Sequence, residues 1–145
     1  MKTSCQFPLT TVGGLILASD GTILFVRSQK WSDLYTLPGG KVELGESRES
    51  AFEREIMEET GLALKNIQFA ICQDSIFNDE YHDPKHFVMH DYIAEIAEGV
   101  SKSDVSLNDE AYEYCWLTLE EARTKKMNRE VYKLLDWYEA FRKNH

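Results

Sequence analysis

The chain contains 145 residues, of which 43% are hydrophobic, and its formal net charge at pH 7 is −9. This length and composition predict a single domain over residues 1–145 with a substantial hydrophobic core. The negative charge argues against a nucleic-acid polymer or an anionic membrane as a partner, because both would repel the chain.

The first third of the chain predicts a β-hairpin followed by a glycine-rich turn. Residues 11–18 are β-branched and apolar, Asp20-Gly21 is a hairpin signal, and residues 22–27 continue as a second strand. Residues 31–37 then lead into Pro38-Gly39-Gly40. We expect the proline and the paired glycines to stop regular structure there and to let the backbone approach a ligand.

A helix is predicted after this turn, with Ser47 as its N-cap and Gly61 closing its C-terminal end. Phe52 and Ile56 lie on one side of it and are expected to face the core. Farther along, the apolar patterns predict three strands, at residues 67–77, 87–96 and 112–117, a short helix from Thr118, and a final amphipathic helix over residues 129–143.

The three cysteines are Cys5, Cys72 and Cys115. Their odd number and wide spacing indicate neither a disulfide framework nor a zinc site, which favours a reducing, cytoplasmic location. The N-terminus has no continuous apolar region typical of a secretory signal, and no apolar run reaches the roughly 18 residues of a membrane-spanning helix. The sequence therefore predicts a cytoplasmic protein without a targeting signal.

Three glutamates share one face of the predicted helix. Glu55, Glu58 and Glu59 stand at positions i, i+3 and i+4, within an arc of ~100°. A solvated acidic face is the ordinary alternative, but it would usually place a Lys or Arg four residues from each glutamate, and only Glu58 has one, Arg54. The pattern therefore favours a bound cation, and Mg²⁺ or Mn²⁺ fits best because hard ions prefer oxygen ligands.

A longer pattern runs from Gly40 to Leu62. Its fixed positions, in order, are Gly40, Glu46, Arg54, Glu55, Ile56, Glu58, Glu59, Gly61 and Leu62. This spacing resembles the signature of the Nudix hydrolases, the MutT-related family. The resemblance implies an α/β fold of the Nudix type, an α/β/α sandwich with a central mixed β-sheet.

The resemblance also implies roles for the motif residues. Glu55, Glu58 and Glu59 would supply metal ligands, with Glu55 alternatively acting as the base that activates water. Arg54 would fix the glutamates by salt bridges, and Glu46 would tie the loop to the helix or join an outer shell of metal ligands.

Two further parts of the site follow from the resemblance. Gly39 and Gly40 would let a backbone carbonyl reach the metal, although simple turn residues would look the same. Nudix proteins commonly bring another acid, as ligand or base, from a loop before a strand that contains tryptophan. Glu110 fits this role better than Glu113, because Glu110 lies at the edge of the loop and Glu113 falls inside the predicted strand.

Candidate substrate contacts are more widely spread. Asn128 opens a segment that resembles the part of MutT-type enzymes in which an asparagine reads a purine, and plain N-capping of the last helix is the alternative. Trp31, Tyr35, Phe77 and Tyr81 could stack on a base, although aromatic side chains beside strands more often pack in the core. Arg27 completes the set of candidate contacts.

The resemblance implies hydrolysis of a nucleoside diphosphate linked to a group X. We expect a metal-dependent enzyme that converts (deoxy)nucleoside triphosphates to the monophosphate and pyrophosphate, with a small nucleotide as its partner and homodimerisation left open. The alternatives are a nucleotide sugar or dinucleoside polyphosphate as substrate, and a non-catalytic module that senses nucleotides. Such a module would be expected to have lost glutamates or the arginine of the motif, and none is missing.

Overall fold

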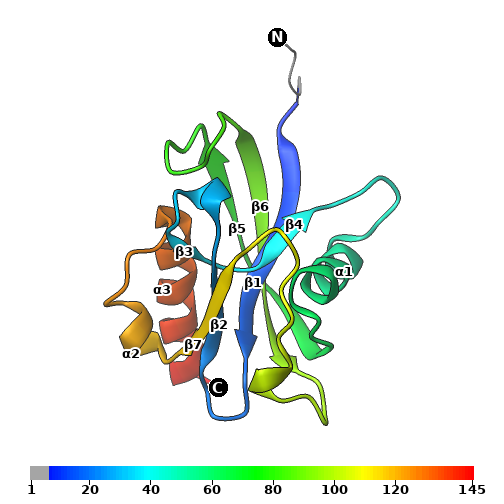
Figure 1. Cartoon of the computed structure of the whole chain (residues 1–145), viewed down its shortest axis with the longest axis vertical. Coiled ribbons are helices and arrows are strands. Elements are labelled where there is room, and N and C mark those ends of the chain that lie inside the picture. The colour runs from blue at the N-terminus through cyan, green and yellow to red at the C-terminus, as the bar shows by residue number, and fades with distance from the viewer. Residues whose placement is uncertain (1–6) are drawn as a thin grey trace.

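The computed structural model describes residues 7–145 and is organised around one seven-stranded sheet (Figure 1). The strands are β1 (Leu9–Leu17), β2 (Ile23–Arg27), β3 (Tyr35–Thr36), β4 (Gly39–Lys41), β5 (Leu64–Ile76), β6 (His86–Ile96) and β7 (Glu113–Leu117). The helices are α1 (Arg48–Thr60), α2 (Leu119–Ala122) and α3 (Arg129–Lys143), with short 3₁₀ turns at Gln29–Trp31 and Lys102–Asp104.

The sheet is mixed, as the sequence predicts. Its main order is β3-β2-β1-β6-β5, with β4 paired to β1 and β7 paired to β2. Strand β1 runs parallel to β6 along its whole length, whereas the remaining pairs are antiparallel. The predicted hairpin between β1 and β2 is confirmed by the pairing of Leu17 with Ile23.

The two faces of the sheet carry different helices, with α1 on one side and α2 and α3 on the other (Figure 1). Alternation along β1 explains this arrangement, because successive side chains of a strand point to opposite faces. Val12 and Ile16 pack in one core cluster with residues of α1, and Leu15 packs in a second cluster with residues of α3. The chain therefore forms the α/β/α sandwich expected from its sequence.

Helix α1 begins and ends where the sequence predicts. The Ser47 hydroxyl accepts a hydrogen bond from the Ser50 N–H, and Gly61 adopts the left-handed conformation, with φ 75°, that ends many helices. Phe52 and Ile56 are fully buried, and each burial of this kind contributes roughly 1.5–3 kcal/mol. These caps and contacts fix the face of α1 that carries the glutamates.

The prediction that Pro38-Gly39-Gly40 stops regular structure was wrong in part, because Gly39–Lys41 forms strand β4. This strand pairs with β1, where Gly13 stands opposite Gly39. A Cβ on Gly39 would lie 2.1 Å from the Val12 carbonyl oxygen. The glycines thus allow two backbones to approach more closely than side chains permit, and the pairing follows from that approach.

The structure also describes two of the cysteines and the lengths of the helices. Cys72 and Cys115 are free thiols, and Cys5 lies outside the described residues. Within residues 7–145, no helix is long and apolar enough to cross a membrane.

Candidate active site

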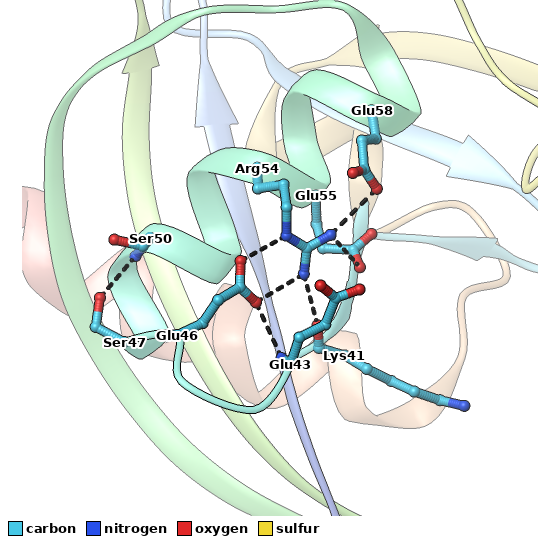
Figure 2. A network of polar contacts seen from close by, with 8 residues as sticks. All are labelled: Lys41, Glu43, Glu46, Ser47, Ser50, Arg54, Glu55 and Glu58. Atoms are coloured by element: carbon cyan, nitrogen blue, oxygen red, sulfur yellow. Dashed lines mark hydrogen bonds and ion pairs between the residues drawn. The ribbon is translucent and has the colours of Figure 1, made fainter.

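Arg54 is the centre of a partly buried polar network between α1 and the loop that precedes it (Figure 2). Its Nε donates to Glu46 Oε2 at 2.6 Å and its Nη2 to Glu46 Oε1 at 2.9 Å, a bidentate pair. Its Nη1 donates to Glu58 Oε1 at 3.1 Å and to Glu55 Oε2 at 3.2 Å, and Nη2 also donates to the Lys41 carbonyl at 3.0 Å. One guanidinium therefore connects the loop after β4 to two glutamates of the helix.

The loop side of this network is held by Glu46. Its carboxylate accepts from Arg54 and, at 2.9 Å, from the Glu43 N–H. These two interactions, the first being the larger, lower the pKa of Glu46 from 4.5 to about 2. Glu46 is thus ionised throughout the physiological range and ties the loop to the helix, one of the two roles predicted for it.

Glu59, the third glutamate of this helix face, is buried, with 5% of its surface exposed. Its Oε1 accepts the Gly39 N–H at 2.9 Å. Burial raises the pKa of Glu59 to about 7 against the opposing effect of this hydrogen bond, and the charges of Glu110 and Glu55 raise it further. Burial likewise raises the pKa of Glu55 above its ordinary value, in spite of the Arg54 hydrogen bond.

Gly40 leaves the space in which the Glu55 carboxylate lies. A Cβ at this position would come within 2.2 to 2.4 Å of the carboxylate carbon and both oxygens of Glu55. Any other residue would therefore displace that side chain. The structure gives Gly40 this steric role, and Gly39 the role of donating its N–H to Glu59.

The glutamates fit a hard divalent cation by their chemistry. Within residues 7–145, no three His, Cys, Asp or Glu side chains are already gathered as a metal-binding group, since Arg54 holds Glu55 and Glu58 while Glu59 contacts Gly39. The available donors are all carboxylate oxygens. The raised pKa values of Glu55 and Glu59 are the effect of burial that a neighbouring positive charge would reverse.

These residues line one side of a cavity of about 450 Å³. Glu110 lines it as well, from the loop before β7, and forms an ion pair with Lys30 at 2.6 Å. Glu113 does not line it and instead pairs with Arg27 at 3.1 Å. The structure therefore brings Glu110, and not Glu113, to the glutamates of α1.

Asn128 also lines the cavity, but its side chain is 3% exposed and is used for folding. Its Oδ1 accepts the Glu130 N–H at 3.1 Å as the N-cap of α3. Its Nδ2 donates to the Thr36 hydroxyl. Asn128 therefore caps α3, as the alternative interpretation of the sequence predicts, and both its Oδ1 and its Nδ2 have a hydrogen-bond partner within the protein.

The aromatic candidates separate into two groups. Trp31 and Tyr81 line the cavity, with ring centroids 4.6 Å apart. Phe77 and Tyr35 do not line the cavity. Phe77 is 64% exposed, whereas Tyr35 packs against the core cluster that contains residues of α3. Arg27, too, is outside, stacked over Tyr35 and Tyr112. Phe77 and Arg27 are thus not brought to the site with the other candidate substrate contacts.

Among the polar residues of the cavity that our sequence reasoning did not single out are Gln73 on β5 and Asp91 on β6. Asp91 is 7% exposed and accepts a hydrogen bond from Gln73 Nε2 at 2.8 Å. Burial raises the pKa of the Asp91 carboxyl to about 7. The available signal was an acid directly before the apolar run Tyr92-Ile93-Ala94, because buried carboxyl groups are uncommon without a specific reason.

Comparison with protein-family models matches residues 8–138 to the NUDIX domain. A Bacillus subtilis (strain 168) protein, provisionally named an 8-oxo-dGTP diphosphatase, is 42% identical over 69 residues, 47% of this chain and 46% of the relative. The NAD-capped RNA hydrolase NudC of Actinobacillus succinogenes is 35% identical over 85 residues, 58% of this chain and 30% of the relative. The matches thus span less than half the length of these curated relatives.

Solved structures share the same fold. The crystal structure of a MutT NUDIX hydrolase from Burkholderia pseudomallei superposes with a TM-score of 0.76 at 25% sequence identity. The superposition covers 91% of this chain and 98% of that protein.

Proposed function

Because the chain belongs to the Nudix hydrolase family, we propose that it is a divalent-metal-dependent hydrolase of phosphoric anhydride bonds. Its substrate would be a nucleoside diphosphate linked to a group X, and specifically a (deoxy)nucleoside triphosphate that is cleaved to the monophosphate and pyrophosphate. The observation that carries this proposal is the placement of Glu55, Glu58 and Glu59 beside one cavity, with Arg54 bonded to two of them.

Glu55, Glu58 and Glu59 would hold the cation, which we propose to be Mg²⁺ or Mn²⁺. When bound, such an ion stabilises negative charge on phosphate oxygens and lowers the pKa of a coordinated water. Arg54 keeps Glu55 and Glu58 oriented, and Gly40 keeps the space for Glu55 open. The acidic chain would then bind an anionic substrate at a local site of opposite charge.

Hydrolysis forms one bond from the water oxygen to phosphorus and breaks one anhydride bond, so one water proton must be accepted. Glu55, Glu59 and Glu110 are among the carboxylates that line the cavity and could accept it. Lys30, paired with Glu110 at 2.6 Å, supplies a positive charge at the same edge.

A nucleotide suits the rest of the cavity. Its volume of about 450 Å³ lies in the range of sites for small molecules, roughly 300–1,000 Å³. Trp31 and Tyr81 offer aromatic surface on which a base can stack. The 8-oxo-dGTP diphosphatase name of the Bacillus subtilis relative supports a triphosphate over a nucleotide sugar.

The proposal is tested by incubating the full chain with nucleoside triphosphates, nucleotide sugars and dinucleoside polyphosphates in the presence of Mg²⁺, with products resolved by chromatography. Reaction in ¹⁸O-labelled water shows which phosphorus is attacked, since the label enters only that product. Glu59→Gln should lower kcat by orders of magnitude, whereas Glu53→Gln, an exposed glutamate of the same helix, should not. Absence of any hydrolysis by the wild-type chain would overturn the proposal.

A further inference from the structure

Asp91 is a buried carboxyl of the cavity that the proposed metal chemistry does not use. Strand register shows where it lies, because Gly13 of β1 pairs with Gly39 of β4 on one side and with Asp91 of β6 on the other. The backbones of Gly39 and Asp91 are therefore two strand spacings apart, roughly 10 Å. Gly39 contacts Glu59, so Asp91 stands at a distance from the glutamates of α1.

Gln73 fixes the Asp91 side chain in the cavity. Its Nε2 donates to Asp91 Oδ2 at 2.8 Å and to the Glu130 carbonyl at 3.1 Å. Among the described residues, its Oε1 is the one buried side-chain polar atom without a hydrogen-bond partner. The two hydrogen bonds that Nε2 donates therefore orient the Gln73 amide, and they leave its Oε1 without a donor.

One oxygen of Asp91 remains for a ligand, since no hydrogen bond other than that of Gln73 reaches its carboxyl within residues 7–145. A phosphate would be repelled here, both by Asp91 and by Glu130 of α3, which lines the same cavity. A neutral group that carries an N–H is the complementary ligand. Such a donor would also favour the ionised form of a carboxyl whose pKa burial raises to about 7.

The nucleobase of the substrate is the part of a nucleotide that has this chemistry. We propose, on the basis of the proposed function, that Asp91 accepts an N–H of the base and so determines which bases are bound, with Gln73 as its positioning residue. Asn128 is less available for this task, because its amide already bonds to Glu130 N–H and to Thr36. Trp31 and Tyr81 then provide the stacking surface beside the polar contact.

The test combines substitutions in the protein with the deletion of single groups from the substrate. Purine riboside triphosphate is ATP without its 6-amino group, and inosine triphosphate is GTP without its 2-amino group. For the wild-type chain, deletion of the group that Asp91 contacts should lower kcat/KM by about tenfold in one of these pairs. Asp91→Ala should bring the ratio of the two kcat/KM values in that pair close to one. The change should lie in KM, with kcat little changed.

Gln73→Leu should give a smaller change in the same ratio, whereas Gln68→Leu, at an exposed glutamine of the same strand, should leave the ratio unchanged. If Asp91→Ala fails to fold, Asp91→Leu replaces it, because leucine fills the space left by the carboxyl. Wild-type ratios in both substrate pairs for the folded Asp91 variant would overturn the inference, and so would equal use of both members of each pair by the wild-type chain.

Failure of the proposed function looks different, because the wild-type chain would then hydrolyse none of these nucleotides. In that case, calorimetric titration with the four corresponding monophosphates tests Asp91 without turnover. A wild-type preference within one pair that disappears in the Asp91 variant supports the contact. Equal or absent binding within both pairs overturns it.

Discussion

Replacing Asp91 with asparagine should make the protein more stable at alkaline pH. The carboxyl is 7% exposed and its pKa is raised from 3.8 to about 7, chiefly by burial, with a further contribution from the charge of Glu130 and an opposing one from the Gln73 hydrogen bond. Between about pH 3.8 and pH 7, the folded protein keeps a proton on Asp91 that the unfolded chain has released. The stability that this proton contributes is full below about pH 3.8 and is lost as pH rises through about 7.

The magnitude follows from the width of that window. Between pH 5 and a folded pKa of about 7 there are about two pH units, and each is worth about 1.36 kcal/mol, so the wild-type free energy of unfolding should fall by about 3 kcal/mol from this group. Asp91→Asn removes the titration while keeping the shape and an oxygen for the Gln73 amide. The variant should therefore gain about 3 kcal/mol relative to wild type between pH 5 and pH 8.

Urea unfolding followed by circular dichroism at pH 5 and pH 8 measures this difference directly. Asp74→Asn is the matched control, since Asp74 is an exposed acid on the neighbouring strand β5. An identical difference between Asp91→Asn and wild type at the two pH values would refute the reasoning, because it would mean that Asp91 titrates normally in the folded state.

Three further predictions concern the site. Arg54→Lys should lower kcat by at least about tenfold and raise the Mg²⁺ concentration needed for half-maximal activity, as a Mg²⁺ titration of activity would show. The reason is that an ammonium cannot make the bidentate pair with Glu46 while also contacting the helix glutamates. Glu110→Gln should reduce kcat more than Glu113→Gln, since Glu110 lines the cavity and Glu113 does not, and equal rates would remove Glu110 from the site. Asn128→Ala should lower the free energy of unfolding by about 1 kcal/mol through loss of the N-cap, with base preference unchanged, as melting curves and kcat/KM for four nucleotides would show.

Local signals predicted the motif helix well. Serine before α1, glycine after it and the buried Phe52 and Ile56 all act within a few turns of the chain, so the sequence contains the information for them. The spacing of Arg54 and Glu58 likewise brings them together by helical geometry alone, and they form the ion pair at 3.1 Å.

Long-range contacts were harder to predict. The parallel pairing of β1 with β6 joins segments far apart in the chain, and no local pattern specifies such a partner. Asp91 gains its place in the cavity from such long-range contacts, because β6 pairs with β1 and with β5, whose Gln73 bonds to it. In the same way, Asn128 has the residue type expected for reading a base, but its tertiary contact with Thr36 occupies the amide.

The central claim is that the glutamates of α1 hold a divalent cation beside the cavity. Electron paramagnetic resonance of Mn²⁺ in the presence of the full chain measures this directly, by the loss of the free-ion signal. The wild-type protein and the Glu53→Gln control should bind Mn²⁺ with similar affinity, and Glu55→Gln and Glu59→Gln should bind it at least about tenfold more weakly. Equal binding by all four proteins, or none by the wild type, would contradict the account.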